Sequence, residues 1–390
     1  MRLSMNTRYA VIHASFWGAY GSLWAFIALV LEYNGFASAQ VGVVTSCATL
    51  LSVFLSPAVS SLLDAQPGLE NRHGAMALLT LAAALSLLAW LMPLPRPFVL
   101  GVCFALIGAF LSSTPPFQNA MAMDANRCGI PVVYGFCRGV GSVSYAAAVL
   151  LLGFVLERHA PTLLLPIFAA LTACGLIAMA GFRLPERPDE AADRPAEHRS
   201  IAAVLRSHPR FALTLLGCMF FFLTHTISNT YMNALVAKAS GTASAVGTSL
   251  AISAVLELPA MTLVSRLQKR FSPGFFLRFA AGAEVVKFLI FYLARSMPLI
   301  YLGHCMQFFQ FAVYAPATVY YVAAALPERD QLKGQSLIYV AGSGLGGALG
   351  NLLGGRLLDR SGIQAALLLG TVSAAASLLT FCLSTRENSR

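Results

Sequence analysis

The stretch that decides the fold is residues 183–210, which read RLPERPDEAADRPAEHRSIAAVLRSHPR. It holds four prolines and six arginines, and no apolar periodicity begins before Ile201. The sequence on either side is dominated by Leu, Ala, Val, Phe and Gly. A polar linker that divides a hydrophobic chain into equal halves is typical of a duplicated membrane protein. We therefore predict an N-terminal half over 1–182, a cytosolic linker over 183–208 and a C-terminal half over 209–390.

The amino-acid composition indicates that most of the chain lies in a lipid membrane. It is 57% hydrophobic and 11% charged, with a mean hydropathy of +0.71, whereas a soluble domain has roughly 25% charged residues. Each apolar run is near the ~20 residues that a helix needs to cross a bilayer. We predict an all-α membrane protein of twelve transmembrane helices in two pseudo-symmetric six-helix bundles. The expected spans are 9–31, 39–63, 74–92, 97–122, 131–156, 161–182, 209–237, 242–265, 274–294, 297–326, 334–357 and 362–384.

The net charge of +10 is explained by topology. With the N-terminus inside, 18 of the 26 Lys and Arg residues fall in cytosolic segments and six in outer loops. Such a bias predicts two cytosolic termini in a multi-pass protein of the inner (cytoplasmic) membrane. The first run is full-length and rich in aromatics, so we expect a retained signal anchor. Membrane lipid is thus the expected surrounding, and nucleic acid is not an expected partner.

Paired elements recur in the two halves and support an internal repeat. SPAVSSLLD (56–64) corresponds to LPAMTLVSR (258–266), and GFVLERHA (153–160) corresponds to GGRLLDRSG (354–362). In such repeats the substrate path runs between the halves near the bilayer midplane. Asp64 and Asp124, where two of the runs reach the cytosolic side, are predicted gate residues.

Run 9–31 carries His13, Trp17, Tyr20 and Trp24 at spacings of 4, 3 and 4. This spacing places them on one helix face, which either lines a polar cavity or packs between helices. In run 131–156, Arg138 lies about seven residues in, so about 10 Å below the surface. An arginine there must face the bundle or water. The glycines and serines beside it permit close helix packing.

The sequence YGFCRGVGSVSY (134–145) resembles the helix-5 motif YGRxRxxGSxG of the lactose-permease-like branch of the major facilitator superfamily, which includes phenylpropionate- and nucleoside-type permeases. The resemblance implies a substrate-cavity role for Arg138 and a stacking role for Tyr145, which occupies the position of a sugar-stacking tryptophan. Phe136 replaces the motif's first arginine, and Ala120 stands where lactose permease has a sugar-binding glutamate. Both departures argue against galactoside recognition.

In the second half, His225, Asn229 and Asn233 form a polar stripe that either contacts substrate or joins helices. Glu257 and Lys287 each lie nine residues from a basic residue at the cytosolic border, which is about 13 Å deep. Opposite charges at equal depth on consecutive antiparallel helices are expected to pair, either for function or for structure. Glu284, one turn before Lys287, competes for the same cation.

The resemblance continues through helices 8 to 11. Glu257 followed by Leu-Pro matches the acidic motif of the phenylpropionate-type relatives, and Lys287 stands at their helix-9 arginine. His304 coincides with the helix-10 histidine of lactose permease, and Gln307 stands at its proton-carrying glutamate. Since glutamine cannot carry a proton, the resemblance implies a proton site at Glu257 with His304 as relay.

The glycine-rich segment GSGLGGALGNLLGG (342–355) follows no strand, so it is interpreted as a close-packing and gating element and not as a phosphate loop. The eight cysteines show no ligand spacing, so neither metal nor cofactor is predicted. No HExxH or GxSxG motif is present, which argues against a membrane enzyme.

We therefore predict a monomeric secondary transporter that moves a small organic solute by alternating access. A sugar, nucleoside or aromatic acid suits the aromatic residues, and a midplane carboxylate favours proton symport. The alternative is a proton-coupled efflux antiporter or an uncoupled facilitator on the same fold.

Overall fold

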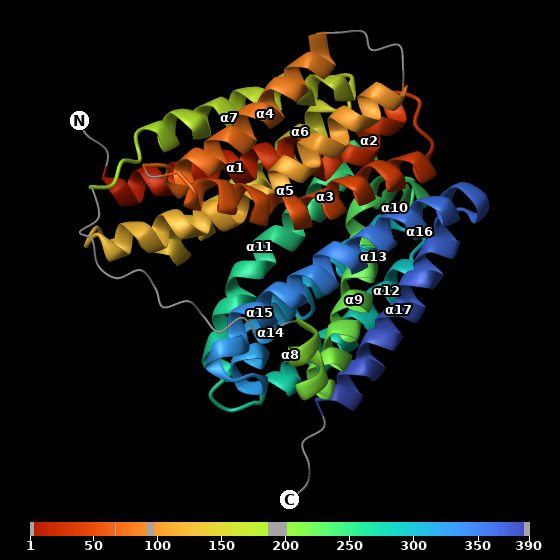
Figure 1. Ribbon diagram of the computed structural model, residues 1–390. Coiled ribbons are helices and arrows are strands. Elements are labelled where there is room, and N and C mark those ends of the chain that lie inside the picture. Colours follow the sequence, from red (N-terminus) through yellow and green to blue (C-terminus); the bar gives the residue numbers. More distant parts are fainter. Residues whose placement is uncertain (1–3, 67, 92–96, 186–200, 386–390) are drawn as a thin grey trace, which may run out of the picture. The chain divides into compact units, whose positions relative to one another are not determined.

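The computed structural model describes residues 4–66, 68–91, 97–185 and 201–385. The contacts divide the chain into two compact units, one of residues 1–188 and 242–254, the other of residues 189–241 and 255–390. The helices of the first unit are α1 (Met5–Leu23), η1 (Trp24–Phe26), α2 (Ile27–Tyr33), α3 (Ser38–Asp64), α4 (Asn71–Leu91), α5 (Pro97–Arg127), α6 (Tyr134–Val155), η2 (Pro161–Leu163) and α7 (Leu164–Ala180), all labelled or traceable in Figure 1.

The later helices are α8 (Ile201–Ser207), α9 (Pro209–Thr230), α10 (Met232–Lys238), α11 (Ala243–Leu267), α12 (Pro273–Leu293), α13 (Met297–Cys305), η3 (Met306–Phe308), α14 (Phe311–Ala325), α15 (Glu328–Tyr339), η4 (Val340–Gly346), α16 (Gly347–Ser361) and α17 (Ile363–Ser384). The first part of α11 belongs to the first unit and its remainder to the second. Much of the predicted linker lies outside the described residues.

The predicted membrane architecture is confirmed. Among the described residues, eleven helical segments are long and apolar enough to cross a membrane. The twelfth expected span is also helical, as the 21-residue α12, and it carries three charged residues. Two of these charged residues, Glu284 and Lys287, belong to the polar cluster described below.

Three spans are interrupted where the sequence predicts continuous helix. The 297–326 span contains Pro316, where a helix could break, but this residue lies inside α14. The break falls earlier, at Gln310, whose φ of −99° and ψ of −92° lie outside the helical region. A 3-10 turn interrupts the first span at Trp24–Phe26, and Tyr231 separates α9 from α10.

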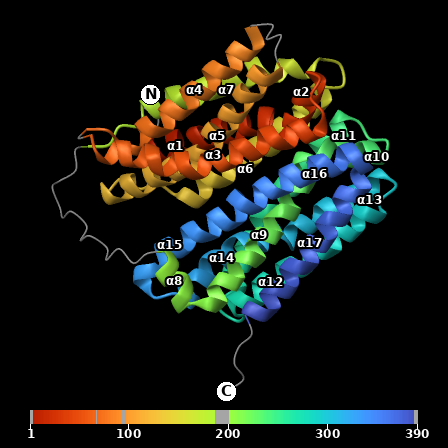
Figure 2. The same ribbon diagram turned by 45° about the vertical axis from the view of Figure 1, so that its right-hand side comes forward.

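In the first unit, whose helices Figure 1 and Figure 2 show in two views, α1 packs against α6 along a seam of small residues. A methyl group on Gly18 would stand 2.8 Å from Ser144 Oγ, and one on Gly141 would stand 2.6 Å from the Trp17 ring. The Ser144 hydroxyl donates to the Ala14 carbonyl at 2.7 Å. The predicted close approach at these glycines and serines is therefore present.

The second unit has an equivalent seam between α9 and the η4–α16 segment. Gly346 lies against the Met219 carbonyl, and Gly350 lies against the Leu223 carbonyl. The π-helical turns of η4 bring its glycines onto α9. Because α9 and α16 occupy the places in the second half that α1 and α6 occupy in the first, the two seams are consistent with the internal repeat.

Candidate functional site: two polar clusters in the two halves

The first cluster is built on Arg138 of α6. Its guanidinium lies over the Trp17 ring of α1, with 4.0 Å between Cζ and the ring centroid. Its Nη1 donates to Ser142 Oγ, one turn along α6, at 2.8 Å. A guanidinium over an indole face gains cation–π attraction, and its planar fork of donors is suited to bonding an anion or hydroxyl. The close approach of α1 to α6 makes this stacking possible.

Aromatic rings continue the cluster along α1. The Tyr20 ring lies 5.5 Å from Trp17 and 6.5 Å from Tyr145 of α6, measured between ring centroids. His13 is 1% exposed, and neither of its ring nitrogens has a hydrogen-bond partner among the described residues. Its ring stands edge-on to Tyr9 and Tyr134. Arg138 thus has an aromatic surface beside it of the kind that stacks on flat solutes.

Trp24 is oriented differently from the other α1 aromatics. Its ring packs directly against Gly108 of α5, so a methyl group on Gly108 would clash with it. The same methyl group would also stand 2.8 Å from Ala48 Cβ of α3. The 3-10 turn that starts at Trp24 ends the regular helical spacing of α1. The predicted single face therefore extends through Tyr20, and Trp24 packs between helices.

The second cluster joins three helical segments through Gln307. Lys287 Nζ of α12 donates to Gln307 Oε1 at 3.1 Å, and Gln307 Nε2 donates to Glu257 Oε1 of α11 at 3.0 Å. The two charges predicted to pair are thus connected through an amide. Glutamine suits this place because it accepts at one end and donates at the other. The resemblance identified Gln307 only as a lost proton carrier, and its bridging role was missed.

Lys287 is the centre of the second cluster. It is 1% exposed, and it interacts electrostatically with Glu257 and Glu284, and also with His225 and His304. Glu284, at 0% exposure, has no hydrogen-bond partner for either carboxylate oxygen among the described residues. A buried carboxylate in that position depends on the nearby cation. Glu284 therefore belongs to the cluster as much as Glu257 does.

The two predicted residues of α9 behave as a pair. Asn229 Nδ2 donates to the His225 carbonyl at 2.8 Å and lies 3.2 Å from His225 Nε2. The His225 ring stacks on Phe311 at 4.5 Å between centroids, with an interplanar angle of 9°. His304 is buried, with its ring 5.0 Å from that of Phe291. Asn229 thus holds His225 in place on the aromatic surface of α14.

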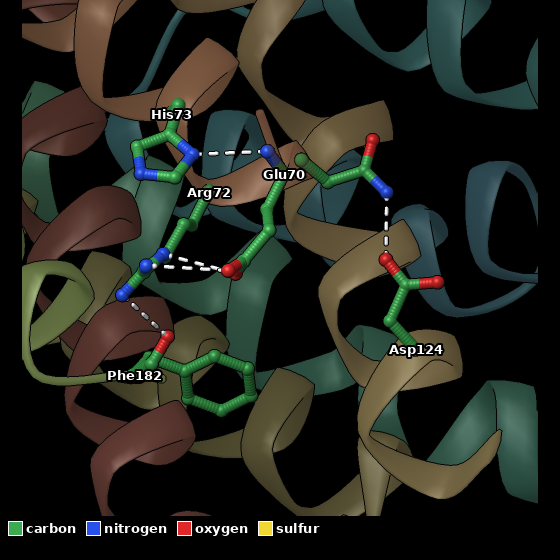
Figure 3. Close-up of polar contacts among 6 residues, drawn as sticks. Glu70, Arg72, His73, Asp124 and Phe182 are labelled. Atoms are coloured by element: carbon green, nitrogen blue, oxygen red, sulfur yellow. Dashed lines mark hydrogen bonds and ion pairs between the residues drawn. The ribbon is translucent and has the colours of Figure 1, made fainter. Parts of the chain in front are cut away.

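The predicted gate residue Asp124 lies at the end of α5 next to the start of α4. Its Oδ2 accepts from Asn71 Nδ2 at 2.7 Å. Figure 3 shows the neighbouring Arg72 between the Glu70 carboxylate, 3.0 Å from its Nε, and the Phe182 carbonyl, 3.2 Å from its Nη1. These contacts tie α4 to α5 and to the end of α7. The side chain of Asp64, the other predicted gate residue, lies outside the described residues.

The comparisons with known proteins agree with this architecture. The family model "MFS_1 like family" matches residues 6–369. The chain is similar to the maltose permease of Geobacillus stearothermophilus, with 26% identity over 370 residues that cover 94% of this chain and 91% of the permease. It is also similar to the uncharacterized transporter YwbF of Bacillus subtilis (strain 168), with 22% identity over 100% of this chain and 96% of the relative.

Solved structures show the same fold. The nucleoside transporter NupG matches with a TM-score of 0.83 at 16% identity and covers 99% of this chain and 100% of its own. The E.coli fucose:proton symporter FucP matches with a TM-score of 0.61 at 17% identity and covers 99% and 100%. The fold expected from the helix-5 and helix-8 motifs is thereby confirmed.

Proposed function

Because this chain belongs to the MFS_1 like family of membrane transporters, we propose that it moves a small organic solute across the cytoplasmic membrane by alternating access, coupled to protons. That it is a transporter and not an enzyme follows from the family and from its permease relatives. The observation that carries the finer proposal is the Glu257–Gln307–Lys287 network, which places a carboxylate and a cation on one bridging amide inside the helical bundle.

The proposed substrate is a sugar, nucleoside or aromatic acid. Arg138 and the rings of Trp17, Tyr20 and Tyr145 supply one cation and three stacking faces. Flat or ring-shaped solutes gain most from such faces, and a guanidinium recognises carboxylate or hydroxyl oxygens. The names of relatives, which include a maltose permease and a nucleoside transporter, are compatible with this class.

Glu257 is the proposed proton carrier. Loss or gain of its proton changes the charge beside Gln307 and so changes the hold on Lys287. A substrate that binds more tightly when Glu257 is protonated is transported with a proton, since binding and protonation are linked. His304 is the proposed relay, Asp64 and Asp124 are proposed gate residues, and the chain is proposed to act as a monomer with both termini in the cytosol.

The first experiment identifies the substrate class. Purified protein is heated with sugars, nucleosides and aromatic acids at two pH values, because a ligand that binds the folded state raises the melting temperature. The solute that gives a shift is then tested for uptake into proteoliposomes with and without an inward proton gradient. Gradient-driven accumulation is expected; turnover of a solute without accumulation would contradict the proposal.

A matched pair of variants separates coupling from structure. Glu257→Gln is expected to keep substrate binding and exchange but lose gradient-driven accumulation, because it cannot release a proton. Glu284→Gln removes the other carboxylate near Lys287 and is expected to leave accumulation dependent on pH. If both variants accumulate solute with the normal pH dependence, symport through this cluster is wrong, and an uncoupled facilitator or efflux antiporter takes its place.

A further inference from the structure

A turn rich in basic residues joins α11 to α12 in the second unit. Arg266 lies in the last turn of α11, and Lys269 and Arg270 follow in the short connection before α12; all three are exposed. Residues 258–283 include no acid, whereas the corresponding turn of the first half, residues 64–73, contains two. The second half therefore presents cations alone at this place, where the first half presents charges of both signs.

Hydrogen bonds fix the shape of this basic turn. The backbone N–H groups of Arg270 and Phe271 donate to the Leu267 carbonyl at 2.8 Å and 3.1 Å. Ser272 Oγ accepts from the backbone N–H of Phe275 at 3.3 Å and so caps the start of α12. The three basic side chains make neither a hydrogen bond nor an ion pair within the described part of the chain. Their charges are thus presented on one ordered turn and are available to a ligand from outside the protein.

The basic turn lies at the level of the phospholipid headgroups. The membrane span of α11 ends at Val264, two residues before Arg266, and α12 begins at Pro273, three residues after Arg270. At 1.5 Å per residue, Arg266 is about 3 Å beyond the hydrocarbon layer, and the headgroup region is roughly 5–7 Å thick on each side. Long basic side chains at this level reach the phosphate oxygens of lipids.

An exposed stripe of aromatic rings continues from the basic turn along α12. It consists of Phe271, Phe275, Phe279 and, from η3, Phe309, each between 38% and 44% exposed. Successive ring centroids are 4.8, 6.1 and 6.2 Å apart. These steps extend at most about 17 Å, which is comparable to the ~15 Å depth of one leaflet of the hydrocarbon layer. The aromatic stripe is therefore long enough to contact the acyl chain of a lipid whose headgroup lies at the turn.

We propose that the basic turn and the aromatic stripe form a binding site for an anionic phospholipid. Its phosphate lies against the three cations, and an acyl chain lies along the rings. Charge complementarity selects this lipid, because the cations attract an anionic headgroup and a zwitterionic headgroup offers no net charge. The site uses no residue of either polar cluster, so it does not depend on the proposed transport function.

The test uses the purified full-length protein in dodecyl maltoside. It is titrated with phosphatidylglycerol or with phosphatidylcholine of the same acyl chains, and the melting temperature is measured. Phosphatidylglycerol is expected to raise the melting temperature in a saturable manner, because a ligand that binds the folded state stabilises it. Phosphatidylcholine is expected to bind at least tenfold more weakly. Glycerol 3-phosphate, which carries the charge without the acyl chains, is expected to give no shift at the same concentrations.

A matched pair of double variants locates the site. Lys269→Gln with Arg270→Gln is expected to weaken phosphatidylglycerol binding at least tenfold, because each cation contributes roughly fivefold near an anionic headgroup. Arg127→Gln with Arg206→Gln removes two exposed cations from the ends of α5 and α8 and is expected to leave binding unchanged. Phe279→Ala shortens the aromatic stripe and is expected to weaken binding about threefold.

The proposal is overturned if phosphatidylcholine stabilises the protein as well as phosphatidylglycerol does, if the two double variants weaken binding equally, or if Phe279→Ala binds like the wild type. A shift with glycerol 3-phosphate equal to that with the lipid also overturns it, because the ligand is then a soluble phosphate. Should the Lys269 and Arg270 double variant fail to fold, Lys269→Gln is compared with Arg127→Gln, and equal binding by these two variants overturns the proposal.

Discussion

The two halves hold their buried cations in different ways. Arg138 in the first half rests on the face of Trp17 and bonds a serine of its own helix. Lys287 in the second half depends on groups from other helices, namely the Gln307 amide and, through it, Glu257. An arginine on a ring is stabilised by an uncharged partner, whereas a fully buried lysine needs counter-charges.

This difference is the basis for assigning different roles in transport to the two halves. A cation that is satisfied by an uncharged ring can exchange its remaining hydrogen bonds for those of a solute at little cost. A cation that is balanced by two carboxylates responds instead to their protonation. We therefore propose that the first half recognises the solute and that the second half couples its transport to protons. The variants of Lys287 and Arg138 below test the two sides of that contrast.

The largest effect is expected from Lys287→Ala. Removal of this cation leaves Glu284 buried without its counter-charge, which costs about 3–5 kcal/mol. Thermal unfolding in detergent should show a large drop in melting temperature, and uptake should be lost. Lys238→Ala is the control: this half-buried lysine donates to the Phe291 and Tyr292 carbonyls, and its loss should cost about 1 kcal/mol.

A double variant shows whether charge is the cause. Lys287→Met together with Glu284→Gln removes both buried charges, so much of the lost stability should return. Equal destabilisation by the single and the double variants would mean that the shape of the lysine matters and that its charge does not.

Substitution of the buried cation of the first half should weaken substrate binding and leave the stability of the fold nearly unchanged. Arg138→Lys keeps the positive charge but loses the planar group that stacks on Trp17. A loss of about 1–2 kcal/mol in substrate binding, roughly tenfold in affinity, is expected with little change in melting temperature. Arg127→Lys at the end of α5 serves as control. If Arg138→Lys instead unfolds the protein while binding persists, the contrast between the halves fails.

The two glycine seams allow a matched packing test. A methyl group on Gly350 would meet the backbone carbonyl of Leu223, which cannot move without shifting α9. A methyl group on Gly18 would meet the Ser144 hydroxyl, which can rotate away at the cost of one hydrogen bond. We expect Gly350→Ala to lose about 1–3 kcal/mol and Gly18→Ala about 1 kcal/mol. Unfolding temperatures in the reverse order would contradict this reasoning.

Local patterns in the sequence were enough to predict the helices and much of the first cluster. Hydrophobic run length located the spans, and the glycines and serines around Arg138 predicted the close packing of α6. These features depend on residues near one another in the chain. The break at Gln310 was missed because Pro316 was the visible helix breaker, whereas the actual break depends on a backbone conformation that the sequence does not mark.

The second cluster depends on register between distant helices. Equal depth placed Glu257 and Lys287 near each other, but the position of Gln307 between them depends on how the span after α12 is interrupted at η3. The sequence showed Glu284 only as a competitor for Lys287, because a single sequence does not reveal that neighbouring helices bury this side chain completely. Tertiary packing decides both points.

The smallest effect is expected at an exposed carboxylate that joins α6 to the start of α11. Glu157 Oε1 accepts from Thr242 Oγ1 at 2.7 Å, and the hydroxyl of Ser244, followed by that of Thr242, lowers the pKa of Glu157 below its ordinary value. Below this contact, Gly153 and Gly247 bring the two helices together. A lowered pKa means that the contact is strengthened above the ordinary carboxyl pKa of about 4.3, and that this gain disappears as the pH falls through the lowered value.

Melting temperatures measured from pH 7 to pH 3 test this contact. The wild type should lose a small increment of stability at the acid end beyond that lost by Glu157→Gln, whose amide still accepts a hydrogen bond but does not titrate. Thr242→Val removes the donor and should reduce the same increment. Because the carboxylate is exposed, solvent weakens the interaction, and the difference between the variants should be much smaller than that caused by Lys287→Ala. A pH profile of Glu157→Gln that overlays the wild type would show that this carboxylate does not hold α6 to α11.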